Sequence, residues 1–490
     1  MTATAASEPA PPRSLRDQVR SAVIWRSGMQ IFSQLVAWAS TFMVIRILSP
    51  EDYGLFAMTS VVLVLLGLVN GYGFANAVIA DRDGGDGQLR QLFGLLIVIN
   101  VALAAVQFSA APFVADYYGQ PRVADLLRVQ ALIYLTNPFL ALGYTVLSRQ
   151  MDFRRQAQVN MASAFISAVA ALAGALAGLG VWTLIVAPLA GFVSRAAGML
   201  IAARMFIWPS FDFRGSKALA SYGSVAMIGQ LFWFIQTQAD IVIAGRALPA
   251  HELGLYTTSL FLAQLFVNKV VPPLNEVAFS AYAKVQDDPA AVSEGFLKSV
   301  RVIMLLAVPF CLGLASVAEP ALHVMLGEKW LPAAPIVEVL ALAMPFMTLH
   351  VLFAPATSAV GRPGIATRSA ILGAAIMPLA FWLGVSADGG RGIAWGWLIG
   401  YPVLTFVSAL WALPVIGVKM AQLGRAVLPP VMAGAAMALV VLALDRVVAD
   451  LSPLPRLVLL VAAGGAAYGL WLLAFARDRL LELRMLAKRG

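Results

Sequence analysis

The chain reads RILSPEDYGLF from Arg46 to Phe56 and RALPAHELGLY from Arg246 to Tyr256. Arginine, leucine, an acidic residue, glycine, leucine and an aromatic residue follow one another in the same order, 200 positions apart. Aligning the preceding residues at the same offset adds a serine, a glutamine, a phenylalanine and an alanine to the identities. The two stretches therefore predict an internal duplication, with one copy in each half.

The residues of the repeated stretch suit a tight turn between two helices. In each copy the arginine would end the preceding helix, where a cation meets the negative end of the helix dipole. An acidic residue, Asp52 or Glu252, would open the next helix, where an anion is favoured. Gly54 and Gly254 would let neighbouring helices approach closely because glycine has no Cβ. The turn itself predicts no activity, so the duplication is the informative feature.

Composition predicts the class of protein. The 490 residues are 60% hydrophobic and 12% charged, with a mean hydropathy of +0.83. A soluble domain carries about 25% charged residues, so this chain could not fold in water without exposing large apolar areas. We therefore predict an all-α, multi-pass integral membrane protein.

Charge and potential metal ligands exclude other classes. A net charge of +9 is what an excess of lysine and arginine in cytoplasmic loops produces, so we expect no nucleic-acid partner. Cys311 is the only cysteine, which leaves no intramolecular disulfide and no cysteine-ligated metal site. The three histidines are too scattered in sequence to form a ligand pair. We expect neither a metal ion nor a cofactor.

Apolar segments long enough to cross a hydrocarbon core of about 30 Å recur along the chain. We predict fourteen, with both termini cytoplasmic, because most of the 34 lysines and arginines then lie on the cytoplasmic side. The segments are 21–45, 53–79, 91–115, 124–147, 157–179, 181–207, 218–244, 253–283, 297–318, 333–358, 364–386, 392–416, 426–449 and 455–476.

The duplication and the span count together predict the domain organisation. A polar cytoplasmic tail at 1–20 would precede an N-lobe of six helices at 21–207 and a C-lobe of six helices at 208–416. Two more helices at 417–476 and a basic cytoplasmic tail at 477–490 would follow. Because six is even, both lobes would enter the membrane in the same sense, as repeats related by an axis along the membrane normal do.

The chain resembles bacterial polysaccharide transporters, the Wzx-type flippases of lipid-linked oligosaccharides in the multidrug/oligosaccharidyl-lipid/polysaccharide exporter superfamily. The resemblance covers roughly residues 20–420 and depends on a set of stretches, each of which is weak alone. They are RILSPEDYGLF at 46–56, LSRQMDFRR at 147–155, the stretch from Asp240 to Tyr256, FSAYAKVQDDP at 279–289 and LGEKWLPAAPI at 326–336.

This resemblance implies two pseudo-symmetric lobes around a central cavity, with two extra C-terminal helices. It implies a transporter that moves undecaprenyl-pyrophosphate-linked oligosaccharide repeat units across the bacterial inner membrane by alternating access, for O-antigen, capsule or exopolysaccharide assembly. Coupling to H⁺ or Na⁺ is left open. The implied partners are the lipid-linked glycan, membrane lipids, and polysaccharide polymerase and chain-length regulator proteins.

Polar residues on the first predicted helix are candidates for the cavity wall. Arg26, Gln30 and Gln34 recur every four residues and so share one helix face. Ionisable groups inside a bilayer are costly and usually face a cavity or a partner. Arg26 could instead reach the cytoplasmic headgroups, and the glutamines could bridge helices by hydrogen bonds.

The seventh predicted helix carries a second polar face. Gln230, Trp233, Thr237 and Asp240 follow at spacings of three, four and three. Gln230 and Trp233 are candidates for substrate binding, although tryptophan is also a common interfacial anchor. Asp240 could be an ion-coupling carboxylate, could neutralise a nearby cation, or could be a hydrated carboxylate near the periplasmic end.

The eighth predicted helix contains NKVVPPLNE at 268–276. Two adjacent prolines break the helical hydrogen bonds, and Lys269 and Glu276 fall on one face. Lys269 is a candidate ligand of a pyrophosphate and Glu276 a candidate for ion coupling. The alternative is a structural salt bridge between them around a kink. Arg301 is a further candidate cation of the cavity.

Three other functions fit the sequence less well. An ion-coupled multidrug or lipid exporter of the same superfamily would share the architecture, but a pump for cationic drugs should carry more buried carboxylates. A major-facilitator carrier is disfavoured because DRDG at 81–84 lacks the rest of that family's motif. A membrane glycosyltransferase or polymerase should carry large outward loops with acid–base residues, and the outward loops here are short.

Overall fold

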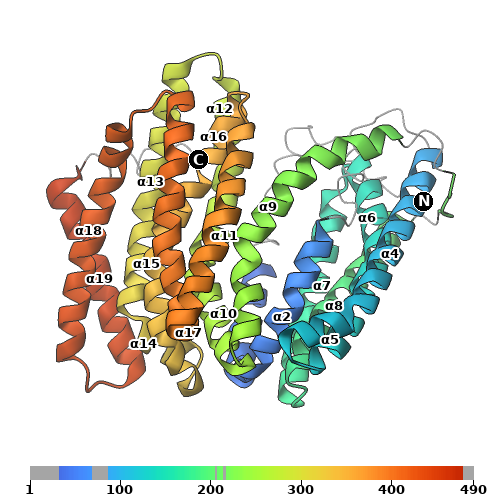
Figure 1. Ribbon diagram of the computed structural model, residues 1–490, viewed down its shortest axis with the longest axis horizontal. Helices are drawn as coiled ribbons and strands as arrows, with labels where there is room; N and C mark the ends of the chain where they lie inside the picture. Colours follow the sequence, from blue (N-terminus) through green and yellow to red (C-terminus); the bar gives the residue numbers. More distant parts are fainter. Residues whose placement is uncertain (1–32, 69–85, 205–206, 213–216, 478–490) are drawn as a thin grey trace, which may run out of the picture. The chain divides into compact units, whose positions relative to one another are not determined.

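The computed structural model describes residues 33–68, 86–204, 207–212 and 217–477, which form helices with short connections and contain no β-strand (Figure 1). Ten helices within these ranges are long and apolar enough to cross a membrane. Phe113, Leu176, Ile201 and Leu439 illustrate their outer faces, since each side chain is 70–76% exposed. Such surfaces suit hydrocarbon rather than water. The chain is therefore an all-α integral membrane protein, and the count of fourteen spans stays a prediction.

The chain forms two compact units, each assembled from separate stretches of sequence. Unit 1 holds the described residues within Met1–Val44, Asn70–Ser109 and Arg128–Leu219. Unit 2 holds those within Ile45–Val69, Ala110–Leu127 and Ala220–Gly490. Parts of the first half of the duplicated sequence thus belong to the unit that contains the second half. The predicted lobe boundaries stay predictions, and the tail at 1–20 lies outside the described residues.

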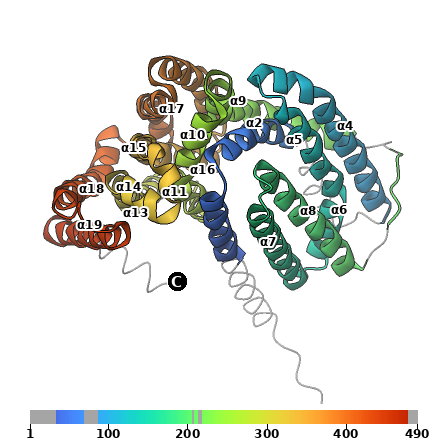
Figure 2. The same cartoon turned by 90° about the horizontal axis from the view of Figure 1, so that it is seen from below.

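Unit 1 packs through small residues at its helix crossings. Figure 2 shows two of its helices, α7 and α8, running side by side. A Cβ added to Gly198 would lie 2.8 Å from Val159 at this crossing, and one added to Gly143 would lie 2.7 Å from Met199. Such close approach is typical of helices packed in a membrane. The main helices are the first part of α4 (Asp86–Tyr118), α6 (Leu132–Arg149), α7 (Phe153–Leu176) and α8 (Val181–Ala203).

Unit 2 contains most of the remaining helices. Its longest, α17, is two helices divided at Asp388 and Gly389, where Gly389 adopts a φ of +51° that favours glycine. The set comprises α2 (Pro50–Gly67), most of α5 (Arg122–Gln130), most of α9 (Lys217–Ala247), α10 (Ala250–Ala263), α11 (Leu265–Lys269), α12 (Val271–Lys284), α13 (Pro289–Ser316), α14 (Ala318–Met325), the 3₁₀ helix η1 (Glu328–Ala333), α15 (Ala334–Val351), α16 (Phe353–Ala359), α17 (Gly364–Ile416), α18 (Met420–Val447) and α19 (Pro453–Phe475).

The two copies of the repeated stretch lie against each other within unit 2. The helices that they open, α2 and α10, pack together. A Cβ on Gly54 would overlap the carbonyl of Ala250, and a Cβ on Gly254 would overlap the carbonyl of Pro50. The contact is therefore reciprocal and runs backbone to backbone. The sequence predicted close approach at both glycines, and the structure shows that each glycine approaches the other copy.

The two arginines of the repeat make matching contacts. Arg46 donates from Nη1 to the carbonyl of Val324 in the last turn of α14, at 3.0 Å. Arg246 donates from Nη1 to the carbonyl of Tyr117 in the last turn of α4, at 2.8 Å. Each arginine lies near the end of its own helix, as predicted. Its hydrogen bond, however, supports the C-terminus of a helix from the opposite half of the sequence.

Alanine at Gly54 or Gly254 should destabilise the fold. The added methyl group would force α2 and α10 apart, and overpacking of this kind costs about 1–3 kcal/mol. We expect a lower melting temperature in detergent and less folded protein in the membrane. Gly67→Ala is the matched control in α2, because a Cβ there would have no neighbour within 4 Å. Equal melting temperatures for all three variants would contradict the packing argument.

Candidate functional site

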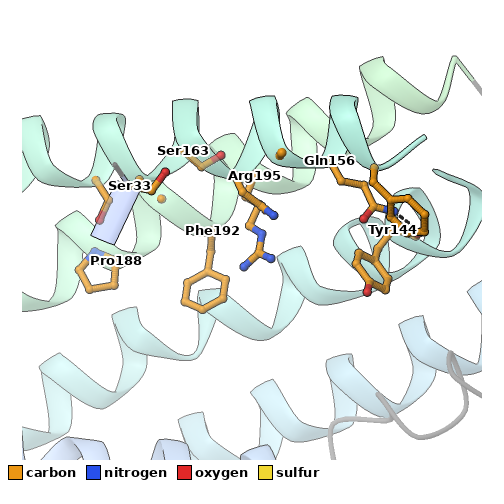
Figure 3. A pocket seen from close by; sticks show the side chains of 13 residues that line it. Ser33, Tyr144, Gln156, Ser163, Pro188, Phe192 and Arg195 are labelled. Atoms are coloured by element: carbon orange, nitrogen blue, oxygen red, sulfur yellow. Dashed lines mark hydrogen bonds between the residues drawn. The ribbon is translucent and has the colours of Figure 1, made fainter. Parts of the chain in front are cut away.

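A polar groove of about 570 Å³ lies in unit 1, between α6, α7 and α8 (Figure 3). Four polar residues of α7 line it at spacings of four, three and four, so they occupy one face of the helix. Ser33 of the first described helix, Ser33–Ile47, adds a hydroxyl. The four α7 residues are Gln156, Asn160, Ser163 and Ser167.

Helix α8 supplies the opposite wall of the groove. Pro188, Gly191, Phe192 and Arg195 share one face of this helix and line the groove. Figure 3 shows the Arg195 guanidinium between the rings of Phe192 and Tyr144 in that view. Arg195 is the one cationic lining residue, and none of the thirteen lining residues, all within the described ranges, is acidic.

The hydrogen bonds of the groove leave acceptor oxygens open. The hydroxyl of Ser163 donates to the carbonyl of Val159 at 2.8 Å, and that of Ser167 donates to the carbonyl of Ala187 at 3.0 Å. These hydroxyls have therefore used their protons and can still accept. Asn160 Oδ1 and Arg195 Nε are buried and have no hydrogen-bond partner.

This arrangement suits an anionic, hydroxyl-rich ligand. A guanidinium offers several N–H donors in a geometry that matches phosphate or carboxylate. The open serine and asparagine oxygens could accept hydrogen bonds from sugar hydroxyls. An ionisable residue inside a membrane-spanning segment costs about 2.5–3.5 kcal/mol on insertion scales, which by default marks a functional site.

A second polar cluster lies inside unit 2, around Asp240 of α9. The Tyr256 hydroxyl donates to Asp240 Oδ2 at 2.6 Å, and the Trp397 indole N–H donates to the Tyr256 hydroxyl at 2.8 Å. Gln236, one turn earlier, donates to the Tyr401 hydroxyl at 3.4 Å. All of these side chains are fully buried, and Asp240 Oδ1 has no partner.

The burial of Asp240 corrects one of the three interpretations of this residue. Asp240 is 0% exposed, so it is not a hydrated interfacial carboxylate. The sequence could not show this, because Tyr256, Trp397 and Tyr401 reach it from α10 and α17. The polar face predicted on this helix is also not uniform, since Gln230 is exposed and Trp233 is 37% exposed.

The other predicted residues on the first and seventh helices are only partly placed. Arg26 and Gln30 lie outside the described residues, and Gln34 is half-buried on the first described helix. Trp233 lines a small cavity of about 110 Å³ in unit 2, together with the buried His350. The roles predicted for these residues stay predictions.

The proline pair of the eighth predicted helix breaks the helix as predicted. Helix α11 ends at Lys269, and α12 begins at Val271 with both prolines in its first turn. Lys269 and Glu276 are both exposed, and in the described part of the chain they form no salt bridge with each other. The proposed structural bridge is therefore not formed. The binding role of Lys269 and that of the half-buried Arg301 on α13 stay predictions.

Sequence reasoning missed the groove of unit 1 as a site. Arg195 lies within the predicted segment 181–207, where the sequence alone does not distinguish a cavity cation from an arginine that contacts lipid headgroups. The polar face of α7 carried a signal that could have been found. Gln156, Asn160, Ser163 and Ser167 recur at helical spacing in an otherwise apolar segment.

The fold is similar to those of solved α-helical membrane proteins. It is similar to a solved structure of the lipid II flippase MurJ in an inward closed conformation, with a TM-score of 0.73 at 12% identity over 93% of this chain and 100% of that chain. It is also similar to an inward-facing multidrug resistance MATE family transporter of the MOP superfamily, with a TM-score of 0.62 at 15% identity over 82% and 99% of the two chains.

The sequence comparison identifies the family. A family model described as polysaccharide biosynthesis protein matches residues 43–335, more than half of the chain, so the chain belongs to that family. Among its relatives is the succinoglycan biosynthesis transport protein ExoT of Rhizobium meliloti (strain 1021). The two are 28% identical over 368 residues, which cover 75% of this chain and 74% of the relative. The resemblance drawn from the sequence motifs is confirmed.

Removing the Tyr256 hydroxyl should destabilise the protein strongly. Tyr256→Phe would remove the side-chain donor to the buried Asp240, and leaving a buried acceptor unsatisfied costs about 1–3 kcal/mol, or more for a charged group. Tyr282→Phe is the matched control, because that buried tyrosine donates to a neutral hydroxyl, Ser299 Oγ, at 2.7 Å. The melting temperatures of the two variants in detergent test this, and an equal decrease would contradict it.

Proposed function

We propose that this chain moves lipid-linked oligosaccharide repeat units from the cytoplasmic to the periplasmic leaflet of a bacterial inner membrane. In this proposal fourteen helices span the membrane, both termini are cytoplasmic, and two lobes alternate access to a central path. The polyprenyl anchor stays in lipid while the pyrophosphate and glycan pass through protein. The chain acts as a transporter and not as an enzyme, and its cargo serves surface polysaccharide assembly beside polymerase and chain-length regulator proteins.

The groove of unit 1 is the observation that carries this proposal. A charged, hydrated head cannot enter hydrocarbon unaided, because unsatisfied polar groups there cost several kcal/mol. The groove offers one cation, open hydroxyl and amide oxygens, and aromatic rings inside an otherwise apolar unit. Family membership and a relative named as a biosynthesis transport protein support the same cargo class.

A multidrug exporter is the second candidate, because the fold is also similar to a multidrug resistance transporter. A pump for cationic drugs needs carboxylates in its binding site. The groove contains an arginine and, among its described lining residues, no carboxylate. The charge of the groove therefore favours an anionic cargo over a cationic drug.

Deleting the chain in its native host tests the cargo. We expect a complete lipid-linked repeat unit to accumulate on the cytoplasmic leaflet while surface polysaccharide is lost. Mass spectrometry of extracted lipids and leaflet-selective labelling measure the two effects. A repeat unit that lacks one sugar would show an enzyme instead, and normal surface polysaccharide with new drug sensitivity would favour the exporter.

We also propose that Asp240 is the site that couples transport to H⁺ or Na⁺. Its carboxylate is fully buried, one of its oxygens is unpartnered, and the Tyr256 hydroxyl holds the other. The other candidate, Glu276, is exposed on α12. A buried carboxylate with a free oxygen can take up a cation that neutralises its charge.

Asp240→Asn should reduce export by about tenfold or more, as loss of an essential intramembrane carboxylate implies, while the protein stays folded. Glu276→Gln should export normally because its carboxylate is exposed. Surface polysaccharide per unit of membrane protein measures both, and proteoliposomes with an imposed H⁺ or Na⁺ gradient identify the ion. Normal export by Asp240→Asn would exclude it as the coupling residue.

A further inference from the structure

We infer that the groove of unit 1 binds the phosphate-bearing part of the cargo, with Arg195 as its anion-binding residue and α7 as the wall that meets the adjoining sugar. This inference rests on the proposed function, because it names the part of that cargo which the groove takes. It assigns a role to Arg195, Asn160 and the hydroxyls of α7.

Arg195 differs from the other arginines of its unit. The Arg155 side chain forms a salt bridge with Asp152 at 3.2 Å and donates to the carbonyl of Ala202 at 3.2 Å. Arg90 donates to the carbonyl of Trp208 at 3.2 Å. Arg195, by contrast, forms no salt bridge with a described residue, and its Nε is buried without a partner. The Arg195 side chain as a whole is half-buried, and a guanidinium without a protein partner at a groove wall is what an anionic ligand can pair with.

The position of Arg195 along α8 argues against a contact with lipid headgroups alone. The residue lies eight positions before the helix ends at Ala203, which is about 12 Å along the axis at 1.5 Å per residue. The Nε of Arg195 is buried at the groove, and the side chain as a whole is half-buried.

The α7 wall of the groove offers hydrogen-bond acceptors to a sugar attached to the phosphate. Asn160 Oδ1 is buried and unpartnered, and Ser163 and Ser167 have already donated their protons to the backbone. This wall thus offers acceptors, and sugar hydroxyls are donors. Phe192 and Tyr144 also line the groove and provide apolar faces for a sugar ring.

The volume of the groove limits the size of the ligand that it can bind. Small-molecule sites occupy about 300–1,000 Å³, and the groove measures about 570 Å³. It can hold a phosphate or pyrophosphate with one or two sugars, and it cannot enclose a long repeat unit. Recognition would therefore depend on the part of the cargo next to its lipid anchor.

Binding of farnesyl pyrophosphate to the full-length protein in nanodiscs tests this inference. We expect Arg195→Gln to weaken binding about tenfold or more, as loss of a charge-assisted hydrogen bond implies, and Arg195→Lys to retain part of the affinity. Arg155→Ala is the matched control, because that cation is already paired with Asp152. Farnesol, which lacks the phosphates, should bind equally to all variants. Melting temperatures report whether each variant is folded.

Two results would overturn the inference. Unchanged affinity of folded Arg195→Gln for farnesyl pyrophosphate would remove the residue from the site. Competition by phosphatidylglycerol as strong as that by the pyrophosphate would show a lipid headgroup site instead. Asn160→Leu is a second variant, which should weaken export without weakening farnesyl pyrophosphate binding, and weakening of neither would exclude the sugar wall.

Failure of this inference can be distinguished from failure of the proposed function. If deletion causes accumulation of the lipid-linked unit but Arg195→Gln exports normally, the function stands and the assignment of the groove is wrong. If deletion causes no accumulation, the proposed cargo is wrong, and selective loss of pyrophosphate binding in Arg195→Gln would still show an anion site.

Discussion

Gly54 and Gly254 bring the backbones of α2 and α10 into direct contact, and this contact holds the two copies of the duplicated stretch together. A side chain at either position would overlap a carbonyl of the other copy. Because the contact is reciprocal, a change in one copy displaces both helices. Arg46 and Arg246 add two further links, since each donates a hydrogen bond to the end of a helix from the opposite half of the sequence.

The membrane-embedded helices of this chain place their polar groups in two kinds of environment, one fully buried and hydrogen-bonded and one at the wall of a groove. In unit 2, Asp240, Tyr256 and Trp397 bond to one another and are sealed from the surroundings. In unit 1, Arg195 and Asn160 border a groove and keep polar atoms without partners. A sealed network stabilises one arrangement of helices or responds to a small ion. A groove with unused donors and acceptors is suited to a larger polar ligand.

The features that depend on neighbours in sequence were predictable, and those that depend on distant packing were not. Composition predicted the membrane class, and Pro272 and Pro273 predicted the break after Lys269 because both effects are local. The burial of Asp240 was not predictable, since its partners Tyr256 and Trp397 come from other helices. The polar face of α7 was visible in the sequence, but only its packing against α8 identifies it as the wall of a groove.

The crossed hydrogen bonds of the repeat have an evolutionary consequence. Because Arg46 holds the end of α14 and Arg246 holds the end of α4, neither half carries a complete set of its own helix caps. Divergence of the two copies is therefore limited by contacts that each copy makes with the other half. A hybrid that combined halves from two relatives would have to retain both arginines and both recipient carbonyl positions.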